Sequence, residues 1–501
     1  MQYGNRRPTA RFAPALAFAA LLLPAFPAEP AHKDELVIGM SLEPPHLDPT
    51  AGAAAAIDEV VYANVFEGLV RIDRNGDVRP GLAESWTISD DGLTYTFYLR
   101  DGVRFHDGIA FDSADVMFTL NRARAENSTN AQKGFFEPIA EVLAPDPLSV
   151  IVKLKRPTGQ FLFNMGSGDA VIVAAESAAT NKTRPVGTGP FRLERWAKGD
   201  RVVLKRHGDD RDSDAVRLNK VVFKFISDPS AQVAALLAGD VDAFPNLGSP
   251  ENLERFRADP RFRVVVGTTE GETILAINNM RPPFSDRRVR RAACHALDRQ
   301  AVVDGAMYGY GTLIGSHFAP HHPAYVDLTE LCTHDVAKAK ALLKDAGHPD
   351  GFSVTLKLPP PSYARRGGEI VAAQLAAVGI KVAIEPMEWA QWLEQVFRGH
   401  DFDLTIVSHT EPLDIDIYAR DDYYFGYRNP EFQVLVQNLN ATVDPDKRNA
   451  LFRQAQRIIA EDAVNGFLFQ LAKHGVWRAD LVGLWENSPV QANDVTGVHW
   501  K

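Results

Sequence analysis

Polar and aromatic side chains gather in three short segments of the C-terminal half of the chain. A guanidinium fork binds a carboxylate or phosphate, a large aromatic ring forms an apolar wall, and carboxylates bind a cation. Such a set suits a zwitterionic or carboxylated small molecule, so we predict a ligand site here. The alternative is that Arg365 is a surface charge at the start of a helix and that Trp389 packs in the core. The candidate residues are Tyr363, Arg365, Arg366, Trp389, Ser408, His409, Glu411 and Asp414.

Each of these segments follows a predicted β-strand. Strands are expected over 352–358, 380–384 and 402–407, separated by helices over 364–378 and 390–398. This alternation predicts a parallel sheet with right-handed crossovers. Because ligands of open α/β sheets bind beyond the carboxyl ends of the strands, the three segments are expected to lie together.

Histidines offer a second kind of chemistry. His317, His321 and His322 lie in a loop flanked by prolines and could ligate a metal ion. Solvated loop histidines, or histidines packed on prolines, are the commoner outcome of this pattern, and the same holds for His409 beside Glu411. We therefore predict no metal site.

Nothing in the sequence indicates catalysis. It contains no Gly-x-Ser-x-Gly nucleophile elbow. The glycines of Gly187-Thr188-Gly189-Pro190 fail as a phosphate loop, because a strand rather than a Lys-Ser/Thr helix start follows them. We predict a protein that is not an enzyme, with no catalytic residue and no cofactor.

Composition narrows the class of protein further. The 501 residues allow roughly two to four domain-sized cores. The formal charge of -10 argues against a nucleic-acid partner. Cys294 and Cys332 are too few for a disulfide framework or a four-cysteine zinc site. One disulfide bond and two unpaired thiols fit the sequence equally well.

The N-terminus carries the pattern of an export signal. Arg6, Arg7 and Arg11 precede an uncharged apolar stretch over 12–28, which three prolines make too poor to span a bilayer. Cleavage is expected after Ala28 or Ala31. We predict a signal peptide over residues 1–31 and export through the general secretory route, which gives a protein that is secreted or, if the cell has two membranes, periplasmic.

Other elements are expected along the rest of the chain. Alternation at period two and turn signals predict strands, and capping residues with apolar periodicity predict helices. The strands are expected over 36–40, 94–100, 148–154, 191–196, 201–206, 220–226 and 240–244, and the helices over 57–66, 116–124, 229–238, 286–308 and 335–346.

A block near the N-terminus carries a resemblance to a known family. The block is made of Arg79-Pro80-Gly81-Leu82-Ala83-Glu84-Ser85-Trp86, Asp91 to Phe97, Leu99 to Gly108 and Phe111 to Val116. It closely resembles the signature of the extracellular solute-binding proteins of the dipeptide/oligopeptide/nickel class (family 5), which serve ABC importers. Gly187 to Phe191, Asn279 to Pro283 with Asp286 to Arg290, and Ala337 to Gly347 agree with it.

The resemblance implies an α/β fold of the type II periplasmic-binding-protein kind. Two lobes would enclose the ligand by closing about hinge strands, and an extra β-rich lobe would be inserted. The expected boundaries are 32–64, 190–273 and 476–501 for lobe I, 65–189 for lobe II and 274–475 for lobe III.

The resemblance also implies a function. The chain would be a monomeric periplasmic receptor that captures a peptide-like or amino-acid-derived solute and delivers it to an inner-membrane ABC permease. A receptor of the same fold for a metal chelate, an opine or an oligosaccharide is the alternative, and an exported hydrolase is a third hypothesis.

Residue roles carry over from the peptide-binding members. Arg365 or Arg366 matches the arginine that binds the ligand's carboxylate, and Trp389 matches an aromatic residue lining the site. An ungapped comparison places Asp414 at the aspartate that binds the amino group, whereas anchoring on Glu411-Pro412 places Ser408 there. Nickel-type members use a histidine from this region, which His409 would match.

Overall fold

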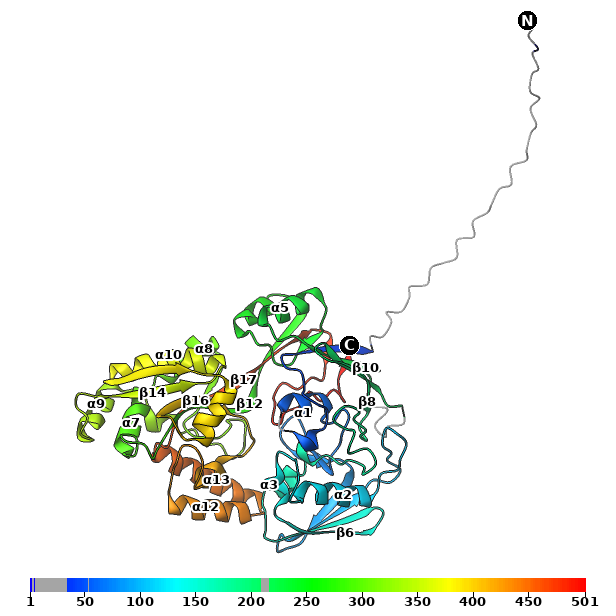
Figure 1. The fold of residues 1–501 in the computed structure, drawn as a ribbon, viewed down its shortest axis with the longest axis horizontal. Helices are drawn as coiled ribbons and strands as arrows, with labels where there is room; N and C mark the ends of the chain where they lie inside the picture. The colour runs from blue at the N-terminus through cyan, green and yellow to red at the C-terminus, as the bar shows by residue number, and fades with distance from the viewer. Residues whose placement is uncertain (2–3, 5–33, 53, 209–215) are drawn as a thin grey trace. The chain divides into compact units, whose positions relative to one another are not determined.

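The computed structural model describes residues 1, 4, 34–52, 54–208 and 216–501 (Figure 1). Apart from Met1 and Gly4, the predicted signal peptide and its cleavage points lie outside the described residues. Among the helices of the described part, none is long and apolar enough to cross a membrane.

An eleven-stranded mixed sheet is the principal element of residues 34–501. Its main path runs β15-β14-β16-β12-β17-β11-β1-β10-β9-β8, and β13 pairs with β17. The strands are β1 (Glu35–Met40), β8 (Phe191–Ala197), β9 (Arg201–Arg206), β10 (Lys220–Phe225), β11 (Ala243–Phe244), β12 (Phe262–Ile277), β13 (Thr312–Leu313), β14 (Phe352–Leu358), β15 (Ile380–Pro386), β16 (Leu404–His409) and β17 (Gly466–Arg478).

A separate four-stranded antiparallel sheet has the order β4-β5-β7-β6. Its inward residues, such as Tyr95, Phe97 and Val150, pack in one apolar cluster with helix α2. The strands outside the principal sheet are β2 (Val70–Ile72), β3 (Val78–Pro80), β4 (Ala83–Ile88), β5 (Thr94–Leu99), β6 (Ile139–Asp146), β7 (Ser149–Leu154), β18 (Leu481–Val482) and β19 (His499–Trp500).

Helices cover these sheets. Most of the long ones begin at an aspartate or asparagine whose side chain accepts a backbone N–H of the first turn, as Asp112 does for α2. The α-helices are α1 (Ala55–Val61), α2 (Ser113–Arg124), α3 (Lys133–Phe136), α4 (Phe161–Asn164), α5 (Pro229–Ala238), α6 (Leu253–Arg257), α7 (Arg287–Ala296), α8 (Arg299–Met307), α9 (Val336–Asp345), α10 (Ser362–Ala377), α11 (Trp389–Trp392), α12 (Pro430–Ala441) and α13 (Pro445–Glu461). Short 3-10 helices are η1 (Pro49–Ala51), η2 (Gly168–Ala170), η3 (Pro250–Asn252), η4 (Thr329–Cys332) and η6 (Ile415–Ala419), and η5 (Leu393–Arg398) is a π-helix.

The predicted parallel unit is confirmed. β14 pairs in parallel with β15 and with β16, and α10 connects β14 to β15 (Figure 1). Val371 and Leu375 of α10 are buried in the same apolar cluster as Leu356 of β14 and Ile406 of β16. The amphipathic period therefore identified the face of α10 that packs on the sheet.

Three expected helices differ in the structure. The helix expected over 57–66 ends at Val61, because Tyr62 is extended. The helix predicted over 286–308 is divided, because Leu297 is extended and Asp298 caps a new helix by accepting the N–H of Ala301. The helix expected over 390–398 begins at Trp389 as α11 and continues as the π-helix η5. Apolar periodicity does not detect a break of one residue when helices on both sides are buried.

The long strands β12 and β17 pair along most of their length. In the principal sheet they lie between β16 of the parallel unit and β11, which pairs with β1. Their register shifts between Thr268 and Glu272, where the Thr269 hydroxyl donates to the Leu471 carbonyl. A β-bulge of this kind bends a strand and directs side chains out of the ladder.

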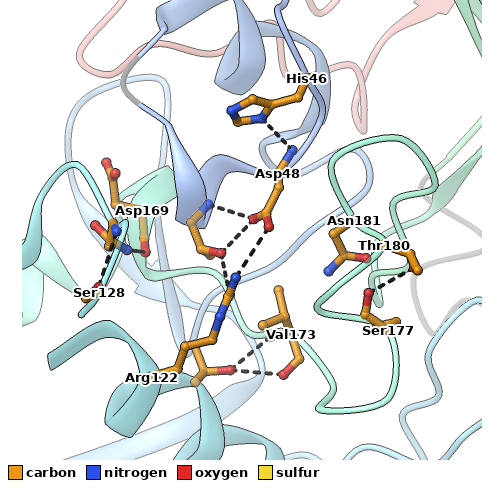
Figure 2. Close-up of polar contacts among 12 residues, drawn as sticks. His46, Asp48, Arg122, Ser128, Asp169, Val173, Ser177, Thr180 and Asn181 are labelled. Atoms are coloured by element: carbon orange, nitrogen blue, oxygen red, sulfur yellow. Dashed lines mark hydrogen bonds and ion pairs between the residues drawn. The ribbon is translucent and has the colours of Figure 1, made fainter. Parts of the chain in front are cut away.

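A polar network joins the 3-10 helix η1 to helix α2 (Figure 2). Asp48 is buried, and its carboxylate accepts both the N–H and the hydroxyl of Thr50. Arg122 of α2 donates to the Thr50 hydroxyl at 2.8 Å and pairs with Asp48 at 3.6 Å. Since a buried carboxylate without partners is costly, Arg122 fixes α2 to η1.

Two carboxyl groups approach one another between α1 and η2. Burial raises the pKa of Asp58 well above its usual range, and the nearby carboxyl of Asp169 adds to the shift. Burial also raises the pKa of Asp169 to about 7, and the Asp169 backbone carbonyl accepts the Asn130 amide (Figure 2).

Asp169→Asn should therefore change the pH dependence of stability. The folded state holds the Asp169 proton more tightly than the unfolded chain, whose aspartates ionise near pH ~3.9. The stability that protonated Asp169 contributes to the fold is therefore complete below that pH and is lost as the pH rises towards 7. By urea unfolding, we expect the variant to gain up to about 4 kcal/mol over the parent at pH 8 and little at pH 4. A gain of the same size at both pH values, or the same pattern in the exposed control Asp101→Asn, would contradict this.

The cysteines that the sequence left open form a disulfide bond. Cys294 of α7 is bonded to Cys332 at the end of η4, 38 residues away. The same segment is held by the Arg299 guanidinium, which donates to the Cys332 carbonyl at 2.7 Å.

Candidate functional site

The segments that follow β14, β15 and β16 meet beyond the carboxyl ends of these strands, as the sequence predicts. We call this region, formed by 359–366, 387–389 and 408–416, the strand-end edge. The Met387 N–H donates to the Leu358 carbonyl at 2.9 Å, which joins the ends of β14 and β15. The Ser408 N–H donates to the Tyr363 hydroxyl at 3.4 Å, which joins α10 to the end of β16. Parallel pairing produces this meeting, because it places all three carboxyl ends on the same side.

The two adjacent arginines of α10 have different surroundings. The Arg365 guanidinium donates to the Met387 carbonyl at 3.3 Å and pairs with Glu388 at 3.2 Å, so it lies at the strand-end edge. Arg366 instead donates to the Tyr308 hydroxyl at 2.6 Å and stacks on that ring, beside α8. Both are exposed, and only Arg365 contacts the segment after β15 among the contacts of the described residues.

Aromatic side chains form one wall of the edge. Trp392 is buried and donates from its indole to the Thr405 hydroxyl of β16. Trp389 packs edge-on against Trp392, with ring centroids 5.5 Å apart, and stays 40% exposed. Trp389 therefore presents an accessible ring supported by a buried one. Burial raises the pKa of Tyr363 to about 12, so its hydroxyl is neutral at physiological pH.

The third segment places its imidazole and carboxylate in a buried cluster. His317 Nε2 lies 2.8 Å from Asp414 Oδ1, and His409 Nδ1 lies 3.7 Å from Asp414 Oδ2. Burial, and then the neighbouring His317, lower the pKa of His409 to about 4. Although burial alone would raise it, the pKa of Asp414 is held below its usual range by His317 and His409. Asp414 is thus a carboxylate and His409 a neutral imidazole at neutral pH.

Glu411 and the Ser408 hydroxyl complete the predicted set. Glu411 is exposed and accepts the N–H of Thr410 at 3.1 Å. The Ser408 Oγ is buried and has no hydrogen-bond partner in the described part of the chain.

Sequence reasoning missed two acidic residues of β12. Glu272 lies opposite His409 in the β12–β16 register and is only 4% exposed. Burial raises its pKa well above the usual range, with Asp414 and Glu270 adding to the effect, and its Oε2 has no partner among the described residues. Glu270 pairs with His321 at 2.7 Å. The available signal was that these are the acidic residues of an otherwise uncharged stretch, Val264 to Ile277.

The buried acids and histidines line a small recess beside the strand-end edge. Its walls are Glu270, Glu272, His317, Phe318, Ala319, His322, Leu413 and Asp414. A larger depression of about 460 Å³ lies between α2, α3 and β6, and its basic residues Arg124, Lys133 and Lys155 all donate to chain oxygen atoms. The strand-end edge remains the better candidate, because the carboxyl ends of the parallel strands bring polar and aromatic side chains together there.

Comparisons with known proteins agree with this architecture. The family model of bacterial extracellular solute-binding proteins, family 5 middle, matches residues 77–425. A glutathione-binding protein of Salmonella paratyphi A is 32% identical over 379 residues, which cover 74% of this chain and 73% of the relative. A di/tripeptide-binding protein of Pseudomonas aeruginosa is 28% identical over 484 residues, or 88% of this chain and 89% of the relative.

A solved structure is similar over nearly the whole chain. It is an ABC transporter-associated periplasmic binding protein of Helicobacter pylori in complex with the peptide STSA. The two chains are 25% identical with a TM-score of 0.80, and the match covers 94% of this chain and 98% of the other.

Proposed function

Because the chain belongs to the bacterial extracellular solute-binding proteins of family 5, which serve ABC importers, and has their type II fold, we propose that it captures a peptide-like or amino-acid-derived solute and delivers it to an inner-membrane permease. It acts as a monomer in the periplasm after removal of residues 1–31, and it releases the solute chemically unchanged.

The chemistry of the strand-end edge supports this class of solute. Glutathione and the di- and tripeptides in the relatives' names carry both carboxylate and amino groups. The edge offers an exposed guanidinium, an exposed aromatic ring and, in the adjoining recess, a carboxylate. The single observation that carries the proposal is the position of Arg365 at this edge, because a guanidinium fork selects a carboxylate.

Four residues of the site then have roles in binding the solute. Arg365 binds the solute's carboxylate, Asp414 binds its amino group, and Trp389 packs against its apolar part. The lowered pKa of Asp414 keeps it ionised for this purpose. The buried Ser408 Oγ, without a partner in the described part, supplies a hydrogen bond to the solute.

Delivery requires the solute to change the protein's conformation. In this proposal, lobe I is made of the regions 32–64, 190–273 and 476–501, and lobe III is 274–475. The strands β12 (Phe262–Ile277) and β17 (Gly466–Arg478) cross the boundary between these two regions. The solute must bind the closed arrangement more tightly than the open one, since a ligand with equal affinity for both shifts nothing. The permease then recognises the closed form.

Thermal unfolding with a panel of dipeptides tests the proposal. A dipeptide present at about 100 times its Kd should stabilise the protein by about 2.7 kcal/mol. Nickel with free histidine, an opine and an oligosaccharide serve as the comparison panel. Stabilisation by one of these and by none of the peptides would contradict the proposed solute class.

Mass spectrometry of the incubated peptides tests the absence of catalysis. We expect each peptide to be recovered intact, and mass spectrometry of the denatured protein to reveal any solute that copurified. Steady hydrolysis of a peptide by the purified chain would contradict a binding role.

A further inference from the structure

A cluster of three side chains at the wall of the recess has the composition of a metal site. Two imidazoles and a carboxylate, from His317, His409 and Asp414, each present one ligand atom, and these atoms lie within 4.8 Å of one another. The three residues come from the loop after β13, the end of β16 and the turn before η6, so the chain converges here from distant positions. Nitrogen and carboxylate oxygen ligands in this number suit zinc, nickel or cobalt ions.

On both imidazoles, the ring nitrogen that faces away from Asp414 lies within hydrogen-bond distance of a buried tyrosine hydroxyl. The Tyr418 hydroxyl lies 3.2 Å from His317 Nδ1, and the Tyr424 hydroxyl lies 3.1 Å from His409 Nε2. Consequently, Nε2 of His317 and Nδ1 of His409 both face Asp414. Hydrogen bonds to the remote nitrogen of a metal-binding histidine set its tautomer and orientation in known metal sites.

A second observation points to a cation at the same place. Glu272 lines the recess with His317 and Asp414, is 4% exposed, and leaves Oε2 without a partner among the described residues. A buried carboxyl oxygen without a partner is costly, and a divalent cation bound by the neighbouring cluster would supply a counter-charge to it.

We propose that His317, His409 and Asp414 bind one divalent transition-metal ion directly, with Glu272 as a neighbouring counter-charge. The ion is held by protein side chains and needs no chelating solute. The proposal goes beyond the proposed function but shares Asp414 with it, since that carboxylate is also assigned to the solute's amino group. Metal binding is therefore measured on solute-free protein and peptide binding on metal-free protein, so that either proposal can fail alone.

Titration of the mature, untagged, metal-free chain with Zn²⁺, Ni²⁺ and Co²⁺ tests the proposal. We expect one equivalent of metal by calorimetry and by elemental analysis after gel filtration, without added histidine. His409→Gln and Asp414→Asn should each lose more affinity than Tyr418→Phe, for which we expect a loss of roughly 10–100-fold as for a supporting residue.

His322→Gln is the matched control. His322 lines the same recess, but its Nδ1 accepts the N–H of Ala324 and is not part of the cluster, so its variant should bind metal like the parent. The proposal is overturned if metal binds only with added histidine, or if the His409 and Asp414 variants keep the parent's affinity.

X-ray absorption of the Zn²⁺-loaded parent gives a measurement that does not depend on the folding of variants. We expect a shell of nitrogen and oxygen at about 2.0–2.2 Å, with the outer-shell scattering of two imidazoles. A spectrum without imidazole scattering would also overturn the proposal.

Discussion

Arg365→Ala is expected to weaken binding of a solute with a free carboxylate by about 2–4 kcal/mol, or roughly 30- to 1000-fold in Kd. Arg365 lies against Met387 and Glu388 at the strand-end edge, and its pairing with the exposed Glu388 can be exchanged for a solute carboxylate. A charge-assisted, bidentate contact in a closed cleft is among the stronger single polar interactions. Calorimetry with a dipeptide identified by thermal unfolding gives the Kd.

Arg366→Ala provides the matched control. It is the same substitution on the same helix, one position away, but the Arg366 side chain binds Tyr308 and not the edge. Its Kd should stay close to the parent value. If Arg366→Ala weakens binding and Arg365→Ala does not, the two arginines have been assigned the wrong way round. If neither does, the carboxylate does not bind at this edge.

A dipeptide amide gives a complementary control. Removal of the solute's carboxylate should weaken binding to the parent, but it should add little to the loss already caused by Arg365→Ala. A double-mutant cycle of this kind isolates the contact between the two groups.

Replacing both cysteines with serine is expected to lower the free energy of unfolding by about 3–4 kcal/mol. The bond closes a loop across a sequence separation of 38 residues, and its loss restores conformational freedom to the unfolded chain. Urea unfolding of the oxidised parent and of the Cys294→Ser/Cys332→Ser variant gives the difference.

Solute binding should be nearly unaffected by the loss of the disulfide bond. The Arg299 guanidinium still holds the Cys332 carbonyl, and His295 Nδ1 still lies 2.8 Å from the Thr333 carbonyl. The parent treated with a reductant should unfold like the serine variant. Equal stability of the oxidised parent and the variant would contradict the expected contribution of the disulfide bond to the free energy of unfolding.

Local patterns accounted for the elements that carry the site. β14 has the bounds expected from its apolar alternation, and α10 has the apolar face expected from the spacing of Val371 and Leu375. The break at Leu297 and the π-helix η5 were not predicted, because apolar periodicity persists through both. These differences arise from capping and tertiary packing, which compete with propensity over one or two residues.

The candidate site residues also divide into those whose positions the sequence predicted and those whose positions it left open. Tyr363 and Ser408 were expected to lie together because parallel strands end at a common edge, and their hydrogen bond agrees with that. Which arginine lies at the edge could not be predicted, since adjacent residues on a helix point about 100° apart and either direction fits the pattern. Whether the cysteines pair was equally open.

The amino-acid sequence alone determined the parallel unit, the order of its polar segments and the family signature, because these depend on neighbours within one or two turns or strands. The tertiary structure decided that His317 meets Asp414, 97 residues later, and that Glu272 lies opposite His409. Such contacts depend on strand register and on the path of loops. A shift of one residue in β12 would direct Glu272 to the other face of the sheet.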